Sequence, residues 1–132
     1  MKVLIIQTAF IGDVVLTTPL ISAASDRFTG AEIHFLTVPY SAPVLRNHPG
    51  LKKVIEYNKR GRGRIRSTRR IRRLLRKEKY DLALIPHRSF RSAFLAKIAG
   101  IPERFGFDRS AGKFLLSRKI PYRRDLHEVE RN

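Results

Sequence analysis

Lys2-Val3-Leu4-Ile5-Ile6-Gln7 opens a stretch that continues as Thr8-Ala9-Phe10-Ile11-Gly12-Asp13 and then as Val14-Val15-Leu16-Thr17-Thr18-Pro19-Leu20-Ile21. Its first part is uniformly apolar from Val3 to Ile6 and largely β-branched, which is typical of a strand buried on both faces of a parallel sheet. Its last part carries apolar residues at roughly helical spacing. We therefore predict a strand–loop–helix unit with Asp13 at the start of the helix.

Asp13 has two alternative roles on this pattern. Ligands of open α/β sheets bind outside the carboxyl ends of the strands, and Asp13 follows such an end. Asp is also a preferred N-cap residue, so Asp13 could serve only to cap the helix. Gly12 either allows a close backbone approach or an unusual dihedral before the helix, or is a plain turn glycine. The pattern alone leaves these alternatives open.

The rest of the chain alternates predicted strands and helices. Strands are predicted at 32–38, 54–57, 81–85, 104–107 and 117–121, and helices at 41–46, 67–79 and 89–99. This alternation is typical of an α/β domain with a mostly parallel sheet, right-handed crossovers and helices on both faces. We expect residues 1–132 to form one such domain, because a chain of this length builds one core.

Composition narrows the classes of function. The chain has no cysteine, which excludes a disulfide framework, a zinc–thiolate site and a thiol nucleophile, and suits a reducing cytoplasm. The formal net charge is +17 at pH 7, and residues 59–77 carry a run of lysines and arginines with no acidic residue. Such a field attracts polyanions, whether nucleic acid, anionic lipid or a phosphorylated glycolipid. No apolar run reaches the length expected of a signal peptide or a membrane span.

Four blocks of sequence, in a fixed order, carry a family resemblance. They are Phe10-Ile11-Gly12-Asp13-Val14-Val15-Leu16-Thr17-Thr18-Pro19, then 80–92, 99–107 and 127–132. Together they resemble the lipopolysaccharide heptosyltransferases of glycosyltransferase family 9. These bacterial sugar transferases are built from two facing Rossmann-like domains, the GT-B architecture. The resemblance implies that residues 1–132 are the Rossmann-like N-terminal, acceptor-side domain, with the C-terminal donor-binding domain absent from the chain.

The resemblance also implies an activity. It is the inverting transfer of heptose from ADP-heptose to a lipopolysaccharide inner-core acceptor, with Asp13 as the catalytic base. An attacking acceptor hydroxyl loses its proton, and a carboxylate within hydrogen-bond reach can accept it. No metal or other cofactor is expected. The donor would be held mainly by the second domain, since the first loop lacks both glycine-rich nucleotide motifs, so we expect the isolated chain to be inactive.

Basic residues are the candidates for acceptor binding, because the family's acceptor is an anionic lipid A core. Arg88 and Arg91 could clasp phosphates or carboxylates with forked hydrogen bonds, and His87 is either a binding or acid–base group or an ordinary loop histidine. The glycine-containing basic loop Arg60-Gly61-Arg62-Gly63-Arg64 could close over the acceptor. The same charge would hold the protein peripherally at an anionic membrane surface, on the cytoplasmic side of the inner membrane. The full acceptor-binding set is Gly12, Arg60, Arg62, Arg64, His87, Arg88 and Arg91.

Other functions remain open on composition alone. The chain could be a basic α/β module that binds nucleic acid or another polyanion without catalysis, or a binding protein in which Asp13 is only a cap. The basic run lacks the interleaved aromatic residues that stack on bases, so we expect nucleic acid to bind only non-specifically. His127 and Arg131 are expected to pack between domains. An uncovered cleft face would favour self-association.

Overall fold

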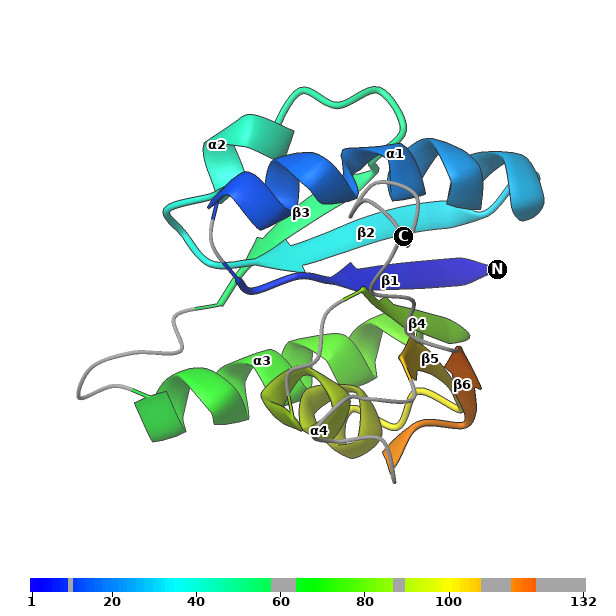
Figure 1. Ribbon diagram of the computed structural model, residues 1–132. Helices are drawn as coiled ribbons and strands as arrows, with labels where there is room; N and C mark the ends of the chain where they lie inside the picture. The colour runs from blue at the N-terminus through cyan, green and yellow to red at the C-terminus, as the bar shows by residue number, and fades with distance from the viewer. Residues whose placement is uncertain (10, 58–63, 87–89, 108–114, 121–132) are drawn as a thin grey trace.

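A computed structural model describes residues 1–9, 11–57, 64–86, 90–107 and 115–120. In this part of the chain the strands form a six-stranded sheet in the order β3-β2-β1-β4-β5-β6, and every neighbouring pair is parallel (Figure 1). The strands are β1 (Lys2–Ile6), β2 (Glu32–Thr37), β3 (Lys53–Glu56), β4 (Leu82–Ile85), β5 (Glu103–Phe107) and β6 (Arg118–Ile120).

Helices cover both faces of this sheet (Figure 1). One face carries α1 (Ile11–Arg27) and α2 (Ala42–Leu45), and the other carries α3 (Arg64–Glu78) and α4 (Phe90–Ile98). The predicted α/β class, the parallel sheet and the helices on both faces are therefore confirmed. The predicted boundaries of the elements after α1 lie within three residues of the observed ones.

β1 lies in the middle of the sheet and contributes to both hydrophobic cores. Val3 and Ile5 pack on the side of α1, whereas Leu4 and Ile6 pack on the side of α3 and α4. All four side chains are completely buried, which explains why this strand is apolar at consecutive positions rather than at alternate ones.

The helices bury narrow stripes. In α1 the buried residues are Val14, Thr17, Ile21 and Ala24, spaced three or four apart. In α3 Ile71 and Leu75 are buried and Leu74 packs against them as predicted. No helix within the described ranges is both long enough and apolar enough to cross a lipid bilayer.

Pro19 lies inside α1 without leaving an unpaired carbonyl. A proline has no N–H, so the carbonyl oxygen of Val15 loses its usual helical donor. The hydroxyl of Thr18 donates to that oxygen at 2.7 Å instead. The helix therefore continues through Pro19 to Arg27.

Candidate functional site

The order of the strands defines where a ligand would bind. The chain leaves β1 for α1 on one face of the sheet and leaves the neighbouring β4 for α4 on the other face (Figure 1). In open α/β sheets such a switch point creates a crevice beyond the carboxyl ends of the two strands. The loop after Ile6 and the first turn of α1 lie at this end of β1.

Gln7 organises the loop that follows β1. Its side chain is buried, its Oε1 accepts a hydrogen bond from the backbone N–H of Ala9 at 3.2 Å, and its Nε2 donates to Oγ1 of Thr17 at 3.2 Å. The Thr17 hydroxyl donates in turn to the backbone carbonyl of Asp13 at 2.7 Å. One amide side chain thus ties the loop to the turn of α1 that carries Asp13.

A second contact joins this loop to the helix on the opposite face. The hydroxyls of Thr8 and Ser92 lie 3.5 Å apart, and both side chains are buried. Ser92 belongs to the first turn of α4, so the loop after β1 touches the element that follows β4. Sequence reasoning missed Gln7, Thr8 and Ser92; the one local signal was a polar Gln7 directly after a fully apolar strand.

Asp13 lies in the first turn of α1, since the helix begins at Ile11. The prediction that Asp13 lies at the start of the helix is therefore confirmed, whereas the alternative that it is the N-cap is wrong, because Asp13 lies inside the first turn. Its side chain is half-buried, and no described residue forms a hydrogen bond or ion pair with its carboxylate. The unpaired N–H groups of a first helical turn favour a negative charge there. The site therefore presents a partly desolvated carboxylate whose oxygens are available to a ligand.

The structure tests one of the sequence-based expectations for Gly12, an unusual dihedral before the helix. It lies within the first turn of α1 rather than before it, and the glycines with positive φ among the described residues are Gly30 and Gly100. A Cβ added at Gly12 would meet no atom within 4 Å. The unusual dihedral is therefore wrong, and the space beside Gly12 is open.

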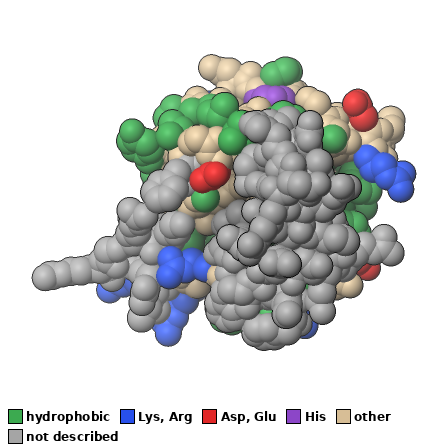
Figure 2. Space-filling model, viewed as in Figure 1, with side chains coloured by type: hydrophobic (Ala, Val, Ile, Leu, Met, Phe, Trp, Pro, Cys, Tyr) green, Lys and Arg blue, Asp and Glu red, His purple; other side chains and the backbone are tan. Residues whose placement is uncertain are grey.

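The predicted acceptor-binding residues fall mostly outside the described ranges. His87, Arg88, Arg60 and Arg62 lie there, and Arg64 is described only as the first backbone position of α3. Arg91 is half-buried in the first turn of α4, next to Ser92, and so belongs to the switch-point end of the sheet. Figure 2 shows Lys and Arg side chains gathered on the part of the molecule where α3 lies.

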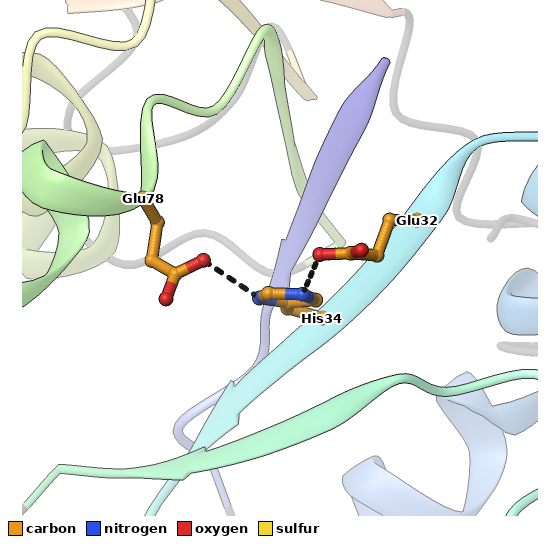
Figure 3. A group of neighbouring side chains, drawn as sticks. All are labelled: Glu32, His34 and Glu78. Atoms are coloured by element: carbon orange, nitrogen blue, oxygen red, sulfur yellow. Dashed lines mark hydrogen bonds and ion pairs between the residues drawn. The ribbon is translucent and has the colours of Figure 1, made fainter.

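A polar network occupies the opposite, amino-terminal edge of the sheet (Figure 3). His34 is buried, with Nδ1 2.6 Å from the Tyr80 hydroxyl and Nε2 2.8 Å from a Glu32 carboxylate oxygen. Both contacts are satisfied when Nε2–H donates to Glu32 and Nδ1 accepts from the Tyr80 hydroxyl. Glu78 approaches the same ring, with 3.9 Å between its carboxylate and Nδ1.

This network has metal-ligand chemistry but already holds a cation. The ligand atoms of Glu32, His34 and Glu78 lie within 4.8 Å of one another. The Lys2 ammonium, however, sits 3.0 Å from Glu78 and 3.8 Å from Glu32. Both carboxylates of the group are thus already paired with a lysine, and the group is best described as a structural ion-pair network.

The charges of this network shift one another's pKa values. Hydrogen bonds from Lys2 and then Lys53 lower the pKa of Glu78, and the hydrogen bond from His34 lowers the pKa of Glu32. The hydrogen bond to Glu78 raises the pKa of Lys2. Burial raises the pKa of the Tyr80 phenol, which keeps it a neutral donor to His34.

Comparisons with known proteins identify relatives that contain this domain. A family model described as glycosyltransferase family 9 (heptosyltransferase) matches residues 68–132. Lipopolysaccharide heptosyltransferase 2 of Escherichia coli strain K12 is 30% identical over 108 residues, which are 81% of this chain and 31% of that protein. The chain spans about a third of the length of the curated relatives it matches, between 31% and 40%.

Solved structures agree with these matches. The Escherichia coli heptosyltransferase WaaC with ADP superimposes with a TM-score of 0.85 at 26% identity, covering 99% of this chain and 44% of that one. A glycosyl transferase family 9 protein from Veillonella parvula superimposes with a TM-score of 0.88 over 98% of this chain and 39% of its own, which at 20% identity supports the fold alone.

Proposed function

This chain belongs to glycosyltransferase family 9, the heptosyltransferase family, and from this premise we propose that it forms the acceptor-side domain of an enzyme that transfers heptose from ADP-heptose to a lipopolysaccharide inner-core acceptor. A second, donor-binding domain would complete the enzyme. One observation carries the proposal: the half-buried Asp13 carboxylate has no partner among the described residues and lies beyond the carboxyl end of β1.

Asp13 would act as the general base. A hydroxyl of the acceptor gives its proton to the Asp13 carboxylate while its oxygen attacks the anomeric carbon of the heptose. The bond from that carbon to the diphosphate oxygen breaks on the opposite side, so the configuration inverts and ADP leaves as the anion. Gln7 and Thr17 hold the turn that carries Asp13, which supports a fixed distance between the carboxylate and the attacking hydroxyl.

Acceptor recognition would use the basic residues near the switch point. Arg91 lies in the first turn of α4. Among the basic residues of the predicted acceptor-binding set, it is the one whose side chain the structure describes. Arginine binds phosphate and carboxylate groups through paired N–H donors, the groups that an inner-core acceptor carries. We extend the proposal to Gly12, Arg60, Arg62, Arg64, His87 and Arg88, and to a peripheral position on an anionic, cytoplasmic membrane face.

Asp13→Asn, made in the protein that carries both domains, tests the proposal. Because Asn cannot accept the proton, turnover of ADP-heptose should fall by about 10²–10⁴ while the donor still binds. Loss of one charge from a first turn changes the free energy of unfolding by less than about 1 kcal/mol. Asp26→Asn, at the exposed far end of α1, is the matched control and should keep full turnover. Near-normal turnover of Asp13→Asn would remove Asp13 from the mechanism.

A further inference from the structure

A groove of about 530 Å³ lies at the amino-terminal edge of the sheet, away from Asp13. It lies where the first residues of β1 and β3 meet the second half of α3. β1 separates this groove from the switch point: a strand rises about 3.3 Å per residue, so the two edges are more than roughly 10 Å apart. A ligand bound here would not touch the proposed base. The basic residues that line the groove are Lys2, Lys53, Arg70, Arg73 and Lys77.

One carboxylate, that of Glu78, lines the groove beside these cations, and it is already paired with two lysines. It accepts from Lys2 at 3.0 Å and from Lys53 at 3.2 Å (Figure 3 shows its position beside His34). These two contacts fix both ammonium groups at the edge of the groove. The groove therefore keeps a positive excess that Glu78 cannot neutralise.

Three of the cations lie on one side of α3. Arg70, Arg73 and Lys77 are three and four residues apart, the spacing of neighbours on a helical surface. None of the three has a carboxylate within 4.0 Å in the described part of the chain. Like charges at this spacing repel one another, and an anion shared among them relieves the repulsion.

The chemistry of the lining selects the kind of anion. Two arginines one turn apart offer paired N–H donors that match phosphate oxygens, and lysines add point charges at the rim. Leu74, packed against the core, supplies an apolar wall beside them. We propose that this groove is a second ligand site, which binds a multiply charged phosphate group, either free in solution or on a lipid headgroup.

The first test is binding of sodium pyrophosphate to the full chain at constant ionic strength, followed by calorimetry and by the change in Tm. We compare Arg70→Gln/Arg73→Gln with Arg69→Gln/Arg72→Gln. Both pairs are exposed on α3 and remove the same charge, but Arg69 and Arg72 do not line the groove. The first variant should lose at least about tenfold in affinity and most of the Tm shift, because a charge-assisted hydrogen bond is worth more than a decade in Kd. The second variant should bind nearly as the parent does.

Three results would overturn the groove site. The first is pyrophosphate binding that both double variants weaken equally, since charge alone would then explain it. The second is full binding by the Arg70→Gln/Arg73→Gln variant, and the third is a parent chain that does not bind pyrophosphate. In the last two cases the cations would serve only Glu78 and the carboxyl end of the α3 dipole. Asp13→Asn should bind pyrophosphate in the groove unchanged, so this test and the test of the proposed transferase activity fail independently.

A second arm identifies the source of the phosphate. Vesicles of phosphatidic acid in phosphatidylcholine present a phosphate monoester, which carries up to two negative charges, on a lipid. The groove holds a lipid headgroup if the vesicles bind the parent chain and release it when pyrophosphate is added. The affinity for vesicles should then fall in Arg70→Gln/Arg73→Gln but not in Arg69→Gln/Arg72→Gln. If pyrophosphate shows the difference between the variants and vesicles do not, the ligand is a soluble phosphate. Either outcome supports the site and assigns its source.

Discussion

At the scale of single residues, the link between Gln7 and Thr17 matters most for the candidate active site. Both side chains are buried, and the Thr17 hydroxyl is the acceptor for the Gln7 amide as well as the donor to the Asp13 carbonyl. A change that removes this hydroxyl leaves a buried N–H without its acceptor. Such an unsatisfied group costs about 1–3 kcal/mol.

Thr17→Val should therefore lower the free energy of unfolding by about 1–3 kcal/mol. It should also lower turnover, because the turn that carries Asp13 loses the hydrogen bond that ties it to Gln7, in the loop after β1. Thr18→Val is the matched control: the same atoms change, but the Thr18 hydroxyl bonds one exposed carbonyl, which water can satisfy. Urea denaturation and steady-state kinetics measure both variants. Equal effects of the two substitutions would show that the Gln7–Thr17 link has no special role.

The residue scale also shows what sequence patterns can and cannot locate. The pattern places Asp13 correctly beyond the end of β1 and at the start of α1, but the N-cap alternative is wrong. Asp is favoured both at an N-cap and in a first turn, so the sequence signal is the same for the two positions. Ser92 and Thr8 are 84 residues apart, and Lys2 and Glu78 are 76 apart. Contacts of that kind depend on which strands pair, which local spacing does not encode.

At the scale of elements, local patterns were sufficient for most of the fold. Short apolar strands and the Ile71–Leu75 stripe of α3 predicted the alternation, because parallel sheets need buried strands and one-sided helices. The network at the end of α3 was not predicted, since His34 in the apolar run of β2 gives no local sign of its partners. Glu78, the last residue of α3, connects this network to β1 and β3.

Glu78 gives the fold a dependence on acid. Its pKa is lowered in the folded protein by Lys2 and Lys53, so its ionised form stabilises the fold at pH values above its ordinary value of 4.5. This contribution is lost as the pH falls below 4.5 toward the folded pKa. Glu78→Gln should be less stable than the parent at pH 7, and the difference should shrink below pH 4. Asp26→Asn, whose carboxylate has no ion pair among the described residues, should parallel the parent curve. A Glu78→Gln difference that stays constant with pH would contradict this.

At the scale of the whole molecule, charge dominates how the protein meets its surroundings. The net charge of +17 must be matched by anions, whether counterions, an acceptor glycolipid or a membrane surface. Apolar side chains also reach the surface near the start of α1 and around α2, among them Ile11, Val15, Tyr40 and Val44. The net charge alone would favour binding of any polyanion. A test of function must therefore compare basic residues at different places on the surface while the net charge stays the same.

Two triple variants with the same net charge distinguish the effect of where the arginines lie from the effect of the net charge of the protein. The first triple variant changes Arg60, Arg62 and Arg64 to Gln and lowers the formal charge by three. The second changes Arg69, Arg72 and Lys97 to Gln and lowers it by the same amount. The residues of the second triple are exposed and lie outside the groove and the switch point. Binding to lipid A vesicles should weaken steeply with salt for every variant, because the screening length falls from about 10 Å at 0.1 M to about 3 Å at 1 M. At 0.1 M salt the first triple should lose more affinity, because its residues belong to the proposed acceptor site, where arginines make direct hydrogen bonds to phosphate. Co-sedimentation across a salt series measures this, and equal losses in the two triples would mean that the protein binds the lipid through its overall field alone.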